Sequence, residues 1–567
     1  MRKLINRFSI LLIFTAMLIF SGCSEKPDVM YINGKIYTMS NDNKVVEAVA
    51  IKEGKIMETG TTKDLTDKYE PEETIDLKGA TVLPGFTDSE GSIIEFAKNL
   101  NYINLSYAKS LDEIKQLIIE RTKIASEGEW IGGYGYNESV FTDDDYAKFD
   151  KTFLDQIAPN FNVFIVNGTF STALLNSRAL RVLTITKDTK APGNGEIFVD
   201  ENGELTGLLF NDAINIVKDN MPGLLKSEMI KRVETGVQEI LKYGITEVHD
   251  RSIGEEGIEI IKELIDGNRF PLRVYAVLSG EETTLVDLYL NKGIEVGYKD
   301  HLTVRAITVD YDGLLINQKA VLFEDYKNEP KKSLPYLSED EIINIFNKAA
   351  DKKFQFSIKA VGDKAVNSSL NLIERVSKEK NLSEARTVLE FCEVLDAKDI
   401  SRFGELKVIP SVRPDVTITD LQITEELVNA ETLKKIGLWN SLLKSSGMLV
   451  SASDFPMQQI NPFVQLYYLT TRQRTDTLKI QGINTDQKIS LLDAVKSYTV
   501  WPAYAAFEEN LKGTIEKGKF ADMIVISKDI FNSDSKELLN TKVIRTILSG
   551  RIVYEDKNLL SSLNDGK

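Results

Sequence analysis

The sequence predicts an α/β fold: a TIM (β/α)8 barrel with an inserted α/β segment, plus a small β-sandwich built from both termini. Through the middle of the chain, short apolar runs alternate with helical patterns, as they do where crossover helices join parallel strands. Short strands with two-residue turn signals occupy both ends. Between the first two apolar runs lies a stretch, 99–222, that is too long for one crossover.

The composition describes a globular protein and argues against two kinds of partner. Of 567 residues, 42% are hydrophobic and 27% are charged. The net charge of -16 argues against nucleic acid and leaves no basic patch for an anionic membrane surface. Histidine is scarce, because the chain contains only His249 and His301. Two histidines are too few for a binuclear metal centre built from imidazoles.

Residues 1–22 are predicted to be a lipoprotein signal peptide, followed by a tether at 23–28. Three basic residues precede the apolar run Phe8–Phe20, and small residues then lead to Cys23. The run is shorter than the ~20 residues that span a bilayer. Cleavage would leave Cys23 as a lipidated N-terminus, anchored to the membrane of a bacterial cell envelope outside the cytoplasm. The alternative is an uncleaved anchor in which the cysteine is incidental.

Residues 29–80 and 511–560 are predicted to form the two halves of the β-sandwich. Turn signals at Asn33-Gly34 and Glu53-Gly54 each join two short strands in the first half, as Ser549-Gly550 does in the second. The expected strands are Val29–Ile32, Lys35–Thr38, Ala48–Lys52, Lys55–Glu58, Ala521–Ile526, Val543–Leu548 and Arg551–Tyr554.

Residues 81–98 and 223–510 are predicted to form the barrel, with the insertion 99–222 over its mouth. The eight expected strands are Thr81–Phe86, Ile245–His249, Leu272–Leu278, Leu302–Val309, Phe354–Ala360, Thr387–Phe391, Lys407–Ser411 and Met448–Ser451. Helical patterns such as Glu228–Leu241 and Glu339–Ala350 fill the connections. Functional residues of a TIM barrel come from the carboxyl ends of its strands, so site residues are sought there.

Several short sequence motifs occur along the chain in the same order as in one enzyme family. They include Pro84-Gly-Phe-Thr-Asp88, Trp130-Ile-Gly-Gly133, Asn176-Ser-Arg-Ala-Leu180, Val248-His-Asp250, Ser453-Asp-Phe-Pro456 and the turn Gly513–Asp522. Over nearly all of 29–555 the chain resembles the metal-dependent amidohydrolase superfamily, in the amidohydrolase-3 branch that includes N-substituted formamide deformylases. The resemblance implies hydrolysis of carbon–nitrogen bonds other than peptide bonds. One or two divalent metals would activate water, and an aspartate on the last strand would shuttle protons.

The metal-ligand positions of that family hold other residues in this chain. The family has histidine at these positions or, in one case, lysine; here they read Glu90, Ser92, Ser171, Thr308, Lys359 and Phe391. Alternate strand residues face the same way, so Glu90 and Ser92 are expected to face one cavity. Asp454 alone matches, at the position of the catalytic aspartate. The resemblance therefore implies a degenerate centre in which zinc is not expected.

The carboxylates left at the strand ends need a counter-charge. Asp454 and Glu90 would share one cavity with Asp310 near them, and unpaired like charges there are costly. We expect Lys359, with help from Arg413, to replace the metal as the internal cation and to pair with Asp454 or Glu90. For either cation the alternative is a solvated loop charge. Another alternative is a Mg²⁺ or Ca²⁺ ion on the carboxylate oxygens.

Four further side chains complete the inventory. Glu390 precedes Phe391 on the sixth strand and belongs to the candidate pocket. His249 is expected to contact a ligand, to pack, or to make an outer hydrogen bond. His301 precedes a strand away from the mouth and is expected to be exposed. Cys392 is expected to be a small buried hydrophobe, without a disulfide partner once Cys23 is lipidated.

Two hypotheses about function follow. The first is a surface-tethered lipoprotein with an amidohydrolase fold and no metal, a pseudoenzyme that binds a small molecule or a partner. The second is an active hydrolase of amide, N-acyl or formamide bonds. It would use Asp454 as general base with Lys359 or Arg413 as oxyanion partner, or a carboxylate-bound metal. Fold alone does not decide between them.

Overall fold

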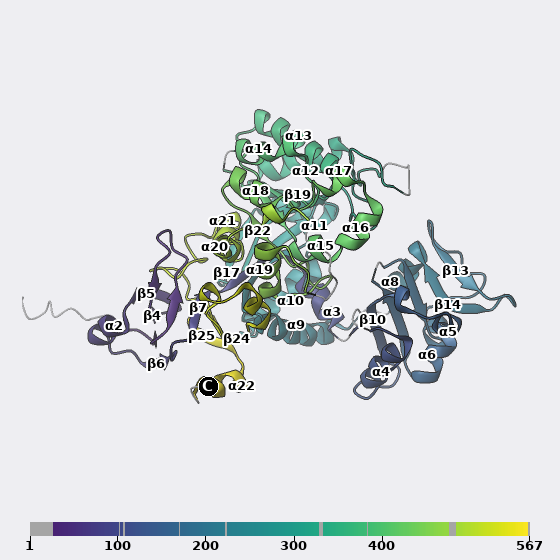
Figure 1. The fold of residues 1–567 in the computed structure, drawn as a ribbon, viewed down its shortest axis with the longest axis horizontal. Coiled ribbons are helices and arrows are strands. Elements are labelled where there is room, and N and C mark those ends of the chain that lie inside the picture. The colour runs from purple at the N-terminus through teal and green to yellow at the C-terminus, as the bar shows by residue number, and fades with distance from the viewer. Residues whose placement is uncertain are drawn as a thin grey trace, which may run out of the picture.

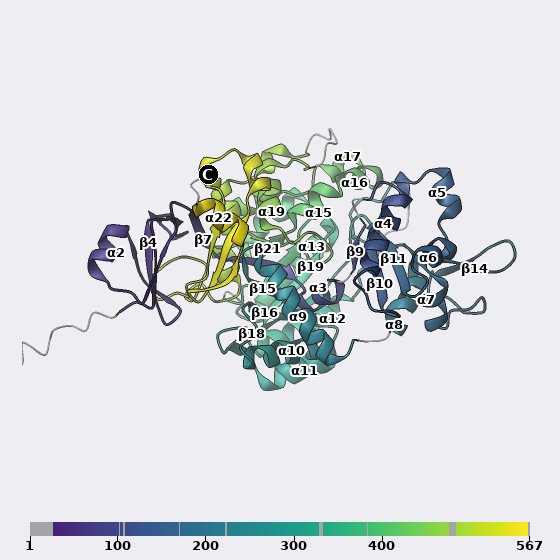
Figure 2. The same ribbon diagram turned by 90° about the horizontal axis from the view of Figure 1, so that it is seen from below.

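The computed structural model describes residues 26–100, 102–105, 108–168, 170–221, 224–327, 333–382, 384–475 and 483–564. The predicted signal peptide and Cys23 lie outside the described residues. In Figures 1 and 2 the β-sandwich and the insertion lie on opposite sides of the central barrel. No helix in the described part of the chain combines the length and the apolarity that crossing a bilayer requires.

Eight parallel strands form the barrel. In order around the sheet they are β8 (Phe86–Gly91), β15 (Ile245–Arg251), β16 (Arg273–Ser279), β18 (Leu302–Asp310), β19 (Gln355–Ala360), β20 (Val388–Phe391), β21 (Ile409–Val412) and β22 (Val450–Ser451). At the seam, Asp454 N donates to Glu90 O and Ser92 N donates to Phe455 O, both at 3.0 Å. The predicted α/β barrel is therefore confirmed. A short strand, β17 (Glu295–Tyr298), pairs antiparallel with β18 outside the ring.

Amphipathic helices cover the barrel strands with their apolar faces. They include α3 (Ile93–Asn99), α9 (Lys226–Leu241), α10 (Glu255–Asp266), α11 (Thr283–Lys292), α12 (Glu339–Asp351), α13 (Asp363–Glu379), α14 (Ala397–Glu405), α18 (Trp439–Ser446) and α19 (Pro462–Thr471). Shorter helices are α15 (Pro414–Thr419), α16 (Leu421–Leu427), α17 (Ala430–Leu433), α20 (Leu491–Lys496) and α21 (Val500–Ala505). At α12, a capping box between Ser338 and Glu341 starts the helix where the sequence pattern predicts it.

The first predicted barrel strand is in fact divided between two sheets. β7 (Thr81–Pro84) belongs to the sandwich, whereas the barrel strand β8 begins at Phe86. The chain crosses at Gly85, where a Cβ atom would collide with the Thr246 side chain. Glycine thus permits the close approach that carries the chain from one domain into the other. Apolar periodicity cannot reveal this change, because both segments are buried.

Two sheets form the sandwich, and both termini contribute to it. One sheet has the order β5 (Lys55–Gly60), β4 (Ala48–Lys52), β1 (Val29–Ile32), β6 (Glu73–Asp76). The other has the order β25 (Arg551–Glu555), β24 (Val543–Leu548), β23 (Met523–Ile526), β7, β2 (Lys35–Tyr37), β3 (Val45–Val46). Their facing side chains, including Tyr31, Val49, Val82 and Met523, form one hydrophobic cluster. Helices α2 (Thr62–Lys68) and α22 (Lys557–Asn564) complete this part.

Two of the three predicted hairpins are confirmed and one is wrong. β4 pairs antiparallel with β5, and β24 pairs antiparallel with β25. β1 and β2 do not pair: β1 lies between β4 and β6, and β2 lies between β3 and β7. The Asn33-Gly34 connection therefore crosses from one sheet to the other. The same turn residues suit both connections, so the local pattern cannot tell them apart.

The insertion has its own mixed sheet and two apolar clusters of its own. Its sheet has the order β13 (Glu196–Val199), β14 (Leu205–Phe210), β12 (Thr172–Leu175), β11 (Asn162–Asn167), β10 (Trp130–Tyr136), β9 (Ile103–Asn104). Its helices are α4 (Leu111–Thr122), α5 (Asp143–Lys148), α6 (Lys151–Ile157), α7 (Ser177–Val182) and α8 (Asn215–Asn220). The sandwich strand β7 precedes the amino end of β8, and the insertion follows beyond the carboxyl end of β8 and helix α3. The mouth of the barrel lies at the carboxyl ends of its strands, so the insertion lies on the mouth side (Figure 2).

Candidate functional site

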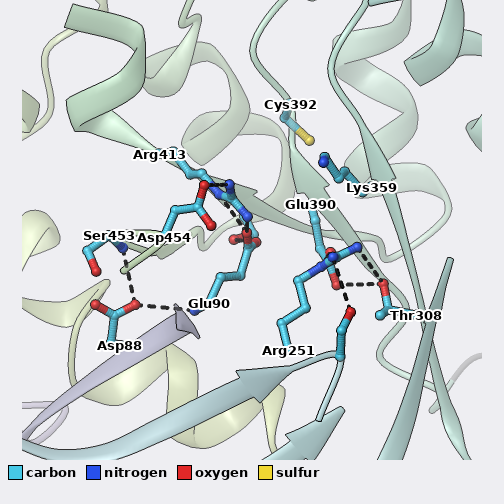
Figure 3. A network of polar contacts seen from close by, with 12 residues as sticks. Asp88, Glu90, Arg251, Thr308, Lys359, Glu390, Cys392, Arg413, Ser453 and Asp454 are labelled. Carbon is cyan, nitrogen blue, oxygen red and sulfur yellow. Dashed lines mark hydrogen bonds and ion pairs between the residues drawn. The ribbon is translucent and has the colours of Figure 1, made fainter. Parts of the chain in front are cut away.

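Charged side chains converge at the carboxyl ends of the barrel strands (Figure 3). Each is the last or nearly the last residue of its strand, or follows it within three residues. They are Glu90 from β8, Arg251 from β15, Asp310 from β18, Lys359 from β19, Glu390 from β20, Arg413 after β21 and Asp454 after β22. They form two clusters, each centred on an arginine.

The Arg413 cluster comprises Glu90, Ser411, Arg413 and Asp454. The Arg413 guanidinium donates to Glu90 Oε2 from Nε at 2.8 Å and from Nη2 at 2.5 Å. Its Nη1 forms an ion pair with Asp454 Oδ2, and the Ser411 hydroxyl donates to the other oxygen of Glu90. Glu90 is 3% exposed and Arg413 is 4% exposed. Burial raises the pKa of Glu90, and Arg413 opposes that rise.

The Arg251 cluster comprises Arg251, Thr308, Asp310, Lys359 and Glu390. Arg251 forms ion pairs with both Asp310 and Glu390 and donates to Thr308 Oγ1 at 3.3 Å. Thr308 Oγ1 in turn donates to Glu390 Oε1 at 3.1 Å, and Lys359 Nζ lies 3.4 Å from Asp310 Oδ2. Burial alone would lower the pKa of Arg251, but Glu390 and Asp310 outweigh it and raise that pKa. Burial alone would raise the pKa of the Asp310 carboxyl, but Arg251 and Lys359 outweigh it and lower that pKa.

Phe391 contacts a cation of each cluster. Its ring centroid is 3.2 Å from Arg413 Cζ and 4.7 Å from Lys359 Nζ. The ring therefore makes a cation–π contact with one cation of each cluster. Phe391 and Cys392 both have left-handed backbones, with φ of 70° and 44°. Two consecutive non-glycine residues in that region are strained. Such strain is common at functional sites, where the surrounding contacts hold the backbone in an unfavourable conformation.

The prediction that Lys359 pairs with Asp454 or Glu90 is wrong. Lys359 pairs with Asp310 because β18 and β19 are neighbours and these two residues are Cα partners in their register. Arg413, expected only to help, is the residue that bridges Glu90 and Asp454. Neither cation is a solvated loop charge, since their side chains are 14% and 5% exposed.

Arg251 is the site residue that sequence reasoning missed. It lies one residue beyond the Val248-His249-Asp250 phrase, at the end of β15. The strand pattern could have revealed it: Glu247, His249 and Arg251 are alternate residues of one strand, and alternate residues face the same side, here the barrel interior. The predicted strand ended at His249, so the alternation was not followed to its last member.

Two predicted pocket residues, Ser92 and Ser171, lie away from the two clusters. Ser92 does not join Glu90 in the cavity, because its hydroxyl caps helix α3 by accepting from Glu95 N at 3.4 Å. Ser171 lies in the insertion, where Asn167 Nδ2 donates to its hydroxyl at 3.2 Å. His249, by contrast, is buried inside the barrel and lines one small cavity together with Glu90 and Glu390. His301 is half-buried rather than exposed, and its Nδ1 lies 2.8 Å from Leu272 O.

Two further buried groups support the site. Cys392 is fully buried, as expected, and burial raises the pKa of its thiol well above the usual range. Asp88, below Glu90, accepts backbone hydrogen bonds from Glu90 N at 3.3 Å and Ser453 N at 3.1 Å (Figure 3). Burial raises the pKa of Asp88 to about 7. Asp88 therefore holds the first and last strand ends together.

The donor set does not match a divalent metal. Among the described residues, no group of three or more histidine, cysteine, aspartate or glutamate side chains is arranged to hold a metal ion. Each strand-end carboxylate of the two clusters already has an arginine partner. A divalent ion bound there would have to approach Arg413, Arg251 or Lys359 closely, and like charges repel.

Comparison with known proteins agrees with this architecture. A model described as the amidohydrolase family matches residues 73–554. The chain belongs to the amidohydrolase family. The resemblance expected from the sequence phrases is thus confirmed at the level of the family.

Named relatives cover almost the whole chain. The putative amidohydrolase YtcJ of Bacillus subtilis is 27% identical over 92% of this chain and 98% of its own length. The N-substituted formamide deformylase of Arthrobacter pascens is 24% identical over 94% and 99%. Among solved structures, an uncharacterized metal-dependent hydrolase from Pyrococcus horikoshii superposes with a TM-score of 0.74 at 24% identity, over 90% of this chain and 99% of its own. That structural likeness supports the fold.

Proposed function

We propose that this amidohydrolase-family chain is a metal-independent pseudoenzyme that binds a small polar molecule at the mouth of its barrel. The observation that carries the proposal is the position of Arg413 between Glu90 and Asp454. The Arg413 guanidinium supplies, beside these two carboxylates, the positive charge that a Lewis acid would supply in the family's chemistry. It neutralises both carboxylates but does not generate a metal-bound hydroxide.

The buried charges hold one another in place. Glu90 is buried with its oxygens accepting from Arg413 and Ser411. Displacing the guanidinium by a metal would leave a buried arginine without a partner, and an uncompensated buried charge is strongly unfavourable. Arg251 is held in the same way by Glu390 and Asp310. Two arginines, rather than two metals, thus account for the strand-end carboxylates.

The partly exposed groups define the ligand chemistry. Asp454 and Asp310 side chains are each 27% exposed, and Lys359 is 14% exposed. Four carboxylates in the two clusters face three cations, so the mouth carries an excess of negative charge. A small molecule with N–H groups for the carboxylates and one oxygen acceptor for Lys359 fits this arrangement. Amides and related N-acyl compounds have that combination.

Metal content and binding together test the proposal. The purified full chain is analysed for transition metals and calcium, then assayed for turnover and for binding of N-acyl and formamide compounds. We expect less than one-tenth of a metal per chain, no turnover, and binding that Asp454→Asn weakens. One tightly held metal per chain, or turnover that zinc restores, would overturn it.

An active hydrolase remains a second candidate because Asp454 is retained and partly open to the mouth. The relative named N-substituted formamide deformylase supports the substrate class. For this candidate Asp454→Asn abolishes turnover, whereas for a binding protein it changes affinity only.

We also propose that the mature chain is a lipoprotein anchored through Cys23 in a bacterial cell envelope. The basic segment, the short apolar run and the small residues before Cys23 support it. A labelled fatty acid supplied to the cells should label the full-length protein, and Cys23→Ser should abolish the label. A full-length protein that carries no label would contradict lipid anchoring.

A further inference from the structure

The centre of the barrel is polar from floor to mouth. Three alternate residues of β15 point into it: Glu247, His249 and Arg251. Glu247 pairs with Lys512 at the floor, and Arg251 belongs to the mouth clusters. TIM-barrel interiors are usually filled by branched apolar side chains. His249, the middle member, is therefore flanked by charge above and below.

A small cavity lies beside His249. The space for the centres of water-sized molecules is about 30 Å³, and its walls include Ser89, Glu90, His249, Ser357 and Glu390. One water molecule needs about 10–15 Å³ by this measure. The cavity is thus large enough for one or two waters and too small for an organic ligand.

Three polar atoms on the cavity wall have no hydrogen-bond partner among the described residues. They are His249 Nε2, Ser89 Oγ and Ser357 Oγ. The three residues are 6%, 8% and 3% exposed, so bulk solvent does not satisfy them. Buried polar groups are almost always hydrogen-bonded, and a water with two to four partners is the usual solution where a polar cavity has room.

We propose that this cavity is a built hydration site that binds one or two water molecules on His249, Ser89 and Ser357, next to Glu90 and Glu390. The bound water hydrates the inner face of both arginine clusters. It also continues the hydrogen-bonded polar core from the mouth toward His249. This site is separate from the proposed ligand site, which lies on the exposed side of the same clusters.

Oxygen-17 magnetic relaxation dispersion of the full chain counts long-lived internal waters. His249→Phe removes Nε2 and keeps a ring in the cavity wall. We expect the count to fall by one or two waters per chain in this variant. Ser369→Ala is the matched control, because Ser369 Oγ is also buried and unpartnered but does not line this cavity. It should leave the count unchanged.

A second measurement needs no variant. Water cross-relaxation to the ring protons of His249 should be present in the wild type. A water count that His249→Phe leaves unchanged would overturn the proposal, as would a His249 ring without water contact. An equal loss in Ser369→Ala would also overturn it.

Discussion

Replacing Arg413 with glutamine tests the internal cation most directly. Arg413 is 4% exposed and contacts Glu90 at 2.8 and 2.5 Å. Removing one partner of a buried ion pair costs about 3–5 kcal/mol, because the other charge is left uncompensated. Glu90 is 3% exposed, whereas the Asp454 side chain is 27% exposed, so most of the cost falls on Glu90. We expect R413Q to lower the free energy of unfolding by about 3–5 kcal/mol near pH 8.

The loss in R413Q should shrink at low pH. Burial raises the pKa of Glu90 while Arg413 opposes it, so the pKa rises further in the variant. A carboxyl with a raised folded-state pKa contributes stability that is complete below its unfolded pKa, about 4.3, and is lost as pH rises through the folded pKa. The difference in unfolding free energy between wild type and R413Q is therefore smaller at pH 5 than at pH 8.

Urea unfolding measured at both pH values checks this expectation. Trp439 is a suitable fluorescent probe, because it is 1% exposed on α18 of the barrel. Arg269→Gln is the matched control: Arg269 pairs with Glu234 at the surface, where such pairs contribute about 0–1 kcal/mol. The double variant E90Q/R413Q should recover most of the loss, since position 90 no longer carries a buried charge without a partner. An R413Q protein as stable as wild type at both pH values would refute the reasoning, as would a double variant no better than R413Q.

Three other predictions concern groups outside the Arg413 cluster. Burial raises the pKa of Asp250 to about 7, so its stabilising effect should be lost as pH rises from 5 to 8; Asp250→Asn should flatten that slope in urea unfolding. Burial lowers the pKa of His249 to about 3, so its ring NMR signals should not shift between pH 8 and pH 5, and a midpoint near 6.5 would contradict this. Lys512 pairs with both Glu247 and Glu508 in the barrel floor. Lys512→Met should therefore lower the free energy of unfolding by about 3–5 kcal/mol, and the double variant Lys512→Met/Glu247→Gln should recover part of that loss. If the single and the double variant are equally stable in urea unfolding, the unpaired Glu247 charge does not destabilise the protein and the expectation is wrong.

Local pattern alone was enough for most of the elements and for most of the charged residues at the site, with β8 and Arg251 as the exceptions. Most barrel strands contain a short apolar run, and burial on both faces makes such a run visible without knowledge of its neighbours. The barrel strand β8 (Phe86–Gly91) does not, because five of its six residues are polar or glycine. The scarcity of histidine was likewise a property of composition. Glu90, Lys359, Arg413 and Asp454 could be placed at strand ends because each lies at or shortly after the end of a strand in sequence.

Only the tertiary structure decided which of these charges meet. Lys359 and Asp310 are paired by the register of β18 and β19, and Arg413 reaches Glu90 because the first and last strands close the ring. Gly85 shows the same limit, since the change of sheet depends on Thr246, far along the chain. Ion pairing depends on distances of a few ångströms between strands remote in sequence. Periodicity along one strand carries no information about those distances, so the sequence determined the charges and the fold determined their partners.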